Sequence, residues 1–185
     1  MSLSEKWINT IFKIATGKKL LRNAMTPVGA VFFFGFLSGL VLISVYLDKV
    51  LEFNSFIPFP FDLYFGLLLL FAGILLAGYC VLFFLKSKGT PVPLNPPPEL
   101  ITDGPYALTR NPMITGLFFV LFGTGFILNS VTLTFFITPL FVILNYIELK
   151  KIEEPELVKR LGEDYKVYRN NVPMFIPNFR KKKSE

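Results

Sequence analysis

Two long runs of almost uncharged residues constrain the fold of this chain more than any other feature. Residues 28–47 form a run of about 20 residues and residues 63–85 one of about 23, and an α-helix of that length crosses a hydrocarbon core of about 30 Å. The composition agrees, because hydrophobic residues make up 52% of the 185 residues and charged residues only 17%. We therefore predict an all-α integral membrane protein that forms a single domain.

Two further apolar runs follow, and only Asn129 and Ser130 separate them. Residues 112–128 and 131–147 each hold about 17 residues, which is at the short end for a full crossing. The short break permits only a tight antiparallel hairpin, and Pro139 is expected to kink its second arm. The sequence thus predicts about four transmembrane helices, with five possible. A re-entrant hairpin that reaches partway through the bilayer is the alternative.

Glycine spacing suggests where the first two spans pack closely against other helices. Gly35 and Gly39 lie four residues apart in the first span, and Gly66, Gly73 and Ala77 form a similar stripe in the second. Small residues at such spacing let two helix backbones approach each other in a membrane. We expect close contacts along both stripes.

The remaining segments are predicted from local signals. Apolar residues at helical spacing, with lysines between them, make an interfacial helix within the arm 1–27, and the prolines of residues 86–111 make a stiff extended loop. The helix after residue 147 is expected to stop at Pro155, where a C-terminal cytoplasmic helix begins. Residues 148–185 hold that helix, whose apolar stripe comprises Leu157, Leu161, Tyr165 and Tyr168, and an extended VPMFIPNF tail with a basic RKKK end.

The basic residues predict the orientation. Lysines and arginines gather in the N-terminal arm, in the tail and, as Lys86, Lys88 and Arg110, in the proline-rich loop, whereas the loop after the first span holds only Lys49. The positive-inside rule places both termini in the cytoplasm. We expect a multi-pass protein of the cell membrane in a prokaryotic host or of the endoplasmic reticulum in a eukaryotic one.

Residue types that are missing from the sequence exclude several kinds of chemistry. The chain has no histidine and a single cysteine, Cys80, so a multi-cysteine metal site and His-based catalysis are not expected. The net charge of +6 comes from residues beside apolar spans and at the chain ends, which favours anionic lipid over nucleic acid as the partner. Membrane lipid is thus an expected partner, and no metal or nucleic acid is expected.

Two polar clusters carry the functional prediction. The first is DGPYALTRNPMITG at residues 103–116, and the second is ELKKIEEPE after the next hairpin arm. The hairpin must bring them together, which offers Arg110 to an anion and Glu153 and Glu154 to a cation or to hydroxyls. Asn111 is predicted to cap the helix that Pro112 begins, whose free amides favour a carboxylate. An interfacial salt bridge with a helix cap is the alternative.

The pattern GPYALTRNPMITG, EEPEL, LGEDYKVY and VPMFIP resembles the isoprenylcysteine carboxyl methyltransferase and phospholipid methyltransferase group of integral membrane enzymes. The likeness covers about the last 90 residues. It implies that S-adenosylmethionine binds within a membrane-embedded helical fold and that Arg110, Glu153 and Glu154 are catalytic. The cofactor-binding residues implied in this way are Gly104, Pro105, Tyr106, Arg110, Asn111, Pro112, Gly116, Glu153 and Glu154.

The sequence departs from the resemblance at two positions. Many members have histidine where Asn111 stands, so that contacts of the ring must be made by an amide or be lost. The family often has tyrosine where Ile114 lies, and a ring contact is lost there.

The resemblance implies methyl transfer to a lipophilic small-molecule or lipidated acceptor that reaches the site from the bilayer. Because the reagent carries the hard chemistry, the protein mainly supplies orientation and desolvation. A carboxylate acceptor, as in isoprenylcysteine-type O-methylation, needs no base, whereas an ethanolamine amine needs one, for which Glu153 and Glu154 are the candidates. Carboxyl O-methylation is the reaction that the resemblance favours, and two alternatives remain: phospholipid N-methylation, and a non-catalytic membrane protein or transporter.

Overall fold

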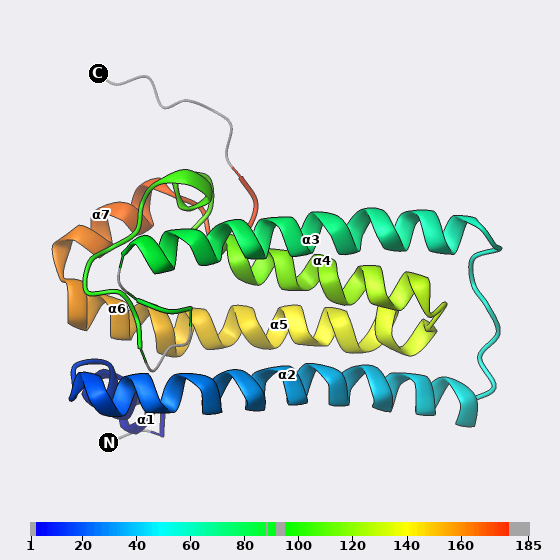
Figure 1. The fold of residues 1–185 in the computed structure, drawn as a ribbon, viewed down its shortest axis with the longest axis horizontal. Coiled ribbons are helices and arrows are strands. Elements are labelled where there is room, and N and C mark those ends of the chain that lie inside the picture. Colours follow the sequence, from blue (N-terminus) through cyan, green and yellow to red (C-terminus); the bar gives the residue numbers. More distant parts are fainter. Residues whose placement is uncertain (1–2, 88, 92–94, 178–185) are drawn as a thin grey trace.

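The structure is a computed structural model and describes residues 3–87, 89–91 and 95–177. In this part of the chain every regular element is a helix, and the helices lie side by side as a long bundle (Figure 1). The sequence predictions for Lys88, Pro93 and the RKKK end fall outside the described residues.

Three helices are long and apolar enough to cross a membrane. They include α2 (Lys19–Val50), α3 (Phe61–Lys86) and a continuous helix, Leu133–Leu161, which contains α5 (Thr138–Glu148) and α6 (Glu154–Leu161). A fourth apolar helix, α4 (Pro112–Ile127), is shorter and lies beside α3 (Figure 1). Many large apolar side chains point outward, as they must toward lipid, including Val31, Phe32, Phe34, Leu68 and Leu75. The predicted all-α membrane fold is confirmed.

Glycines allow the backbones of α3 and α4 to come into direct contact. A Cβ atom added to Gly66 would lie 2.8 Å from the carbonyl oxygen of Gly123, and one added to Gly116 would lie 2.9 Å from that of Gly73. The predicted close contact of the second stripe is therefore confirmed. The prediction for Gly35 is wrong, because a Cβ atom there, as at Gly39, would meet no atom within 4 Å.

The helix from Leu133 to Leu161 contains two turns of π-helix, at Leu133–Ile137 and Leu149–Glu153. Each ends two residues before a proline, Pro139 or Pro155. Proline lacks an N–H and crowds the carbonyl four residues earlier, and the wider π-turn relieves both problems. The predicted helix end at Pro155 is therefore wrong, since the helix continues to Leu161.

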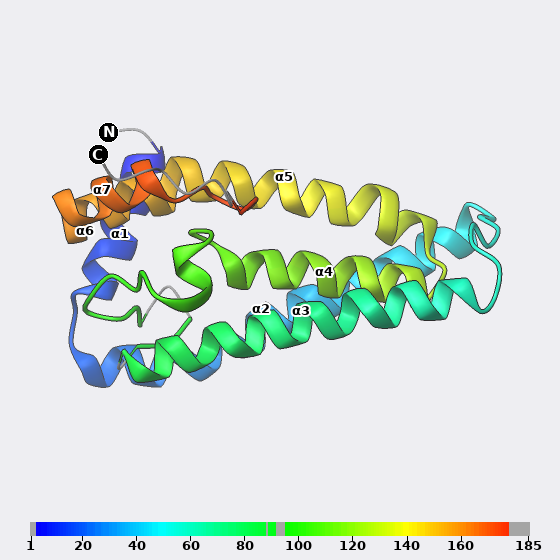
Figure 2. The same ribbon diagram turned by 90° about the horizontal axis from the view of Figure 1, so that it is seen from above.

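The helices are interrupted at two short segments, one near each end of the chain. The interfacial helix α1 (Leu3–Ala15) ends before residues 16–18, and α2 begins within the predicted arm. After α6, Gly162 has a φ of +64°, which favours glycine, and α7 (Glu163–Asn171) then starts in a new direction. The predicted C-terminal helix is thus two helices, and Figure 1 shows that α6 lies between α7 and α1, an arrangement that Figure 2 shows from above.

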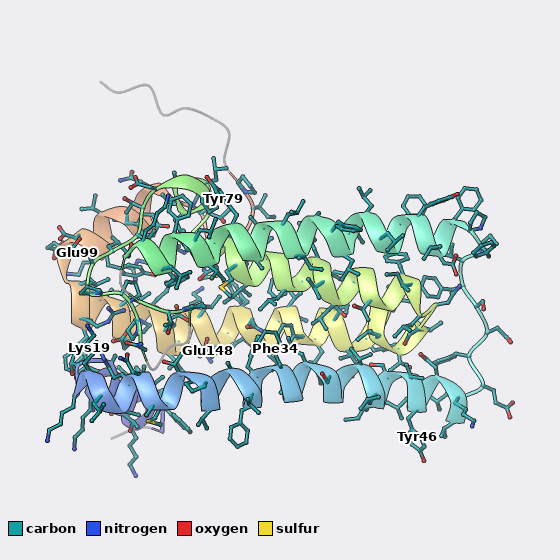
Figure 3. All side chains as sticks on the ribbon, viewed as in Figure 1. Lys19, Phe34, Tyr46, Tyr79, Glu99 and Glu148 are labelled. Atoms are coloured by element: carbon teal, nitrogen blue, oxygen red, sulfur yellow. The ribbon has the colours of Figure 1, made fainter. Side chains whose placement is uncertain are left out.

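Polar residues gather at the two ends of the bundle. We call the end with α1, α6, α7 and residues 95–111 the site end, and the end with residues 51–60 and 128–132 the turn end (Figure 1). Lys19 and Glu99 lie at the site end and Tyr46 near the turn end (Figure 3). The bundle thus has two separate polar regions joined by apolar helices.

The turn end is held by hydrogen bonds of two side chains, Asp48 and Asn129. Asp48 accepts hydrogen bonds from the Ser130 hydroxyl and, at 2.8 Å, from the backbone N–H of Thr132. The Asn129 amide accepts from the N–H of Phe56 at 2.9 Å and donates to the carbonyl of Ile57 at 2.6 Å. These bonds tie the turn between α4 and α5 to the C-terminal end of α2 and to the loop of residues 51–60 that follows it.

Candidate functional site

The first polar cluster is held in place by the tail of the chain. The backbone N–H of Arg110 donates to the carbonyl of Pro173 at 2.8 Å, and that of Asn111 donates to Met174 at 3.1 Å. The ring of Phe175 lies 5.4 Å from that of Phe118 on α4. The VPMFIP segment, residues 172–177, therefore packs against the chain just before α4.

Arg110 and Glu154 meet across the hairpin. Arg110 Nη2 lies 2.8 Å from Glu154 Oε1, and both side chains are only 10% exposed. Arg110 Nη1 also donates to the carbonyl of Arg169 at 3.0 Å, and Arg169 Nη1 lies 4.0 Å from Glu154 Oε2. The predicted meeting of the two clusters is thus observed, and two cations face one buried carboxylate.

This ion pair leaves hydrogen-bonding capacity unused. Arg110 Nε and Glu154 Oε1 are both buried, and neither has a hydrogen-bond partner within the described residues. The short contact between Arg110 Nη2 and Glu154 Oε1 is not aligned as a hydrogen bond. Leaving a buried polar group unpaired costs about 1–3 kcal/mol, and leaving a charged group unpaired costs more. Unsatisfied buried atoms of this kind are expected where a ligand supplies the missing partners.

Glu153 has different neighbours from Glu154, although the two are adjacent. It is half-buried and lies within electrostatic reach of Glu148 and Glu156, with Arg160 as the cation that faces this group. Successive residues of a helix point in directions about 100° apart, which separates the two carboxylates. The structure therefore places Glu154 at Arg110 and Glu153 in a second acidic group, and the predicted shared role of the pair in cofactor binding stays a prediction.

Gly104, Pro105 and Tyr106 form a short 3₁₀ turn, Gly104–Ala107, that packs against α3. Gly104 has a φ of +58°, and a Cβ atom there would overlap the ring of Phe83. Tyr106 is buried, and its carbonyl accepts a hydrogen bond from the Tyr168 hydroxyl at 2.7 Å. Burial raises the pKa of both phenols above its ordinary value, so neither acts as a base near neutral pH.

The predicted position of Asn111 as the N-cap of α4 is confirmed, but the expected side-chain cap hydrogen bond is not formed. The Asn111 amide Nδ2 donates instead to the carbonyl of Met174 at 3.4 Å, because the tail is the nearer acceptor. Pro112 is the first helical residue as predicted, and Gly116 faces Gly73 and Ala77 in the α3–α4 contact. A cofactor contact by Gly116 stays a prediction.

Three residues of the site were not identified from the sequence. Arg169 is the second cation at Glu154, and Glu156 forms a buried ion pair with Arg160 at 3.0 Å. A glutamate four residues before an arginine on a helix is a signal for such a pair. No signal of that kind marks Arg169, whose contact depends on the break at Gly162.

The arrangement suits a small ligand that carries both charges. A buried guanidinium binds a carboxylate and a buried carboxylate binds an ammonium, and here both lie at the end of apolar helices that can reach lipid. The site therefore favours binding and orientation of an organic molecule. The described residues contain no group of three His, Cys, Asp or Glu side chains placed to hold a metal ion.

Comparison with known proteins adds one match. The family model described as phospholipid methyltransferase matches residues 61–164, which is more than half of the chain. The match runs from the start of α3 to the start of α7 and includes Arg110, Glu153 and Glu154. No curated protein matches the sequence.

Proposed function

Because the chain belongs to the phospholipid methyltransferase family, we propose that it methylates a lipophilic acceptor in the membrane with S-adenosylmethionine as the methyl donor. The family and the three long apolar helices make it a membrane methyltransferase, which favours an enzyme over a non-catalytic membrane protein or transporter. The observation that carries the choice of donor is the buried Arg110–Glu154 pair with its two unsatisfied atoms.

The residues of the site suit the charges of this donor. Arg110 Nε is a buried donor without a partner and fits the carboxylate of the amino-acid part, and Glu154 Oε1 is a buried acceptor that fits the ammonium. When bound, S-adenosylmethionine supplies an activated methyl group on a sulfonium centre. The protein orients it through Arg110 and Glu154, and the tail and the proline-rich loop exclude water.

We propose a carboxylate as the methyl acceptor, as in isoprenylcysteine-type O-methylation. A carboxylate already has the lone pair that attacks the methyl group and needs no base. This agrees with a site in which Tyr106 and Tyr168 are neutral and Glu154 is paired with Arg110. The acceptor would enter sideways from the bilayer, since the polar clusters lie at the ends of the spans.

A phospholipid amine is the second candidate acceptor. The family model is described by phospholipid substrates, and Glu153 is a second carboxyl group at the site end that an amine can face. An amine must lose a proton, and Glu153 is the carboxylate not occupied by Arg110. We also propose that the site end faces the cytoplasm, in agreement with the basic residues Lys13 and Lys19 at that end.

Calorimetry on the detergent-purified protein tests the donor. We expect S-adenosylmethionine to bind the wild type, and Glu154→Ala to bind it at least about 30-fold more weakly, because Arg110 loses its partner and the ammonium its acceptor. A wild type that does not bind, or a variant that binds equally well, contradicts the proposal. Labelled methyl groups in native membranes then distinguish the acceptors: base-labile esters indicate a carboxylate, and labelled lipid amines a phospholipid.

A further inference from the structure

A second ion pair with little solvent exposure, between Glu156 and Arg160, also lies in α6. Arg160 Nε is 3.0 Å from Glu156 Oε1, and the two side chains are 13% and 4% exposed. Nothing in the proposed chemistry uses either residue, since Arg110 and Glu154 already provide the opposite charges. Buried pairs of this kind often add little stability compared with apolar residues of the same size. Their presence therefore needs another explanation.

Arg160 also holds the proline-rich loop. Its Nη1 donates to the carbonyl of Pro97 at 3.0 Å, 63 residues earlier in the chain. Pro97 is buried, and the backbone of Gly89 packs so closely on it that a Cβ atom at Gly89 would overlap the proline ring. One guanidinium thus joins α6 to the segment that leads to Arg110.

The same loop is fixed a second time at its other side. The buried Asn95 amide donates from Nδ2 to Asn23 Oδ1 on α2 at 3.1 Å, and the Asn95 carbonyl accepts from the N–H of Thr90 at 2.9 Å. The loop is therefore tied to α2 and to α6 before it reaches the turn at Gly104. A rigid approach of this kind determines where Arg110 lies relative to Glu154.

We propose that Glu156 and Arg160 are positioning residues, which fix the proline-rich loop on α6 so that Arg110 faces Glu154 in the cofactor site. Glu156 holds the guanidinium of Arg160 in the orientation that reaches Pro97. This inference rests on the proposed function for its effect on S-adenosylmethionine, but its effect on the loop does not depend on that function. Neither residue is among those proposed to bind the donor.

Two measurements on the full-length protein in detergent test the positioning role. In Arg160→Ala we expect amide hydrogen exchange in residues 95–109 to accelerate without any ligand, because the link to Pro97 is lost. We expect S-adenosylmethionine to bind about 10- to 100-fold more weakly, since a displacement of about 1 Å in a positioned group has effects of this size. Arg160→Lys, which keeps one donor, should restore part of both properties, and Glu156→Gln should reproduce a weaker form of the defect.

A matched control is the exposed pair Lys166–Glu163 on α7, at 2.6 Å. Lys166→Ala removes an ion pair from the same end of the molecule and should leave both measurements unchanged. The inference is overturned if Arg160→Ala and Glu156→Gln leave the exchange of residues 95–109 at the wild-type rate. It is also overturned if they change exchange equally throughout the protein, which indicates a general loss of stability. A wild type that fails to bind S-adenosylmethionine contradicts the proposed function, while the exchange measurement still decides the positioning role.

Discussion

The site end and the turn end each place a carboxylate near the end of apolar helices, but the two carboxylates have different partners. At the turn end, Asp48 receives hydrogen bonds from Ser130 and Thr132, and the neighbouring Asn129 is also bonded on both sides of its amide. At the site end, Glu154 faces Arg110 at 2.8 Å, yet Glu154 Oε1 and Arg110 Nε have no hydrogen-bond partner in the described part of the chain.

This difference assigns a structural role to the carboxylate at the turn end and a binding role to the carboxylate at the site end. A satisfied buried polar group stabilises the connection it belongs to, whereas an incompletely satisfied one lowers stability unless a ligand completes it. A count of polar residues would not distinguish the two ends. The comparison predicts that substitutions at the site end change ligand binding and that substitutions at the turn end change stability.

The largest effect is expected for Arg110→Ala. It removes the cation for the carboxylate of the donor, so we expect S-adenosylmethionine affinity to fall at least about 100-fold, as for other buried charge pairs. Arg110→Lys, which keeps the charge but not the planar fork, should recover only part of it. Calorimetry measures both. A loss of melting temperature without any loss of affinity would remove the distinction between the two ends.

The second effect concerns Gly73, which lies in the α3–α4 contact that joins the two ends. A Cβ atom there would lie 2.8 Å from the backbone nitrogen of Val120 and force the helices apart. We expect Gly73→Ala to lower the free energy of unfolding by about 2–3 kcal/mol. Gly39→Ala is the control, because its Cβ atom meets nothing within 4 Å. Denaturant titration measures both variants, and equal stabilities would contradict the observed packing.

Asp48→Ala tests the turn end directly. It leaves the Ser130 hydroxyl and the Thr132 N–H without their acceptor, and we expect a loss of about 2 kcal/mol in the free energy of unfolding. The affinity for S-adenosylmethionine should stay within about twofold of wild type, since sites this far apart act additively. Stability and binding are measured on the same preparation. A strong loss of binding at unchanged stability would show that the turn end also serves the ligand.

The smallest effect is expected for Lys166→Ala. Lys166 pairs with Glu163 at 2.6 Å, but the side chains are 44% and 78% exposed. Exposed pairs contribute about 0–1 kcal/mol, so we expect a change of less than about 0.5 kcal/mol that shrinks further at high salt. A larger change measured by thermal unfolding would mean that charge at the site end contributes to stability after all.

The sequence predicted the parts of the fold that depend on local composition. Uninterrupted apolar runs identified the long helices, and the small residues Gly66, Gly73 and Ala77 correctly indicated close packing. The meeting of Arg110 with Glu154 could also be predicted, because a tight hairpin leaves the two segments no other place. Each of these predictions depends only on one apolar segment of the sequence or on one turn between two such segments.

The errors arose where another feature of the structure, either a neighbouring turn or a distant part of the chain, overrides a local signal. Pro155 is ordinarily a stop for a helix, but the preceding π-turn lets the helix continue. Asn111 is a good cap residue, yet the tail, more than 60 residues away, offers it a carbonyl. The Arg160–Pro97 contact likewise joins segments that no periodicity relates. Such contacts depend on the assembled bundle and could not be predicted from spacing.

The two π-turns in the helix from Leu133 to Leu161 have a consequence for its angular phase. Each π-turn adds one residue without completing an extra turn, so the faces before and after it are rotated against each other by about 100°. Side chains in the apolar part of this helix and side chains in its acidic part can therefore face directions that a regular α-helix would not allow. A one-residue deletion within Leu149–Glu153 would turn Glu154 toward another side of the bundle, even though every side chain of the site were still present.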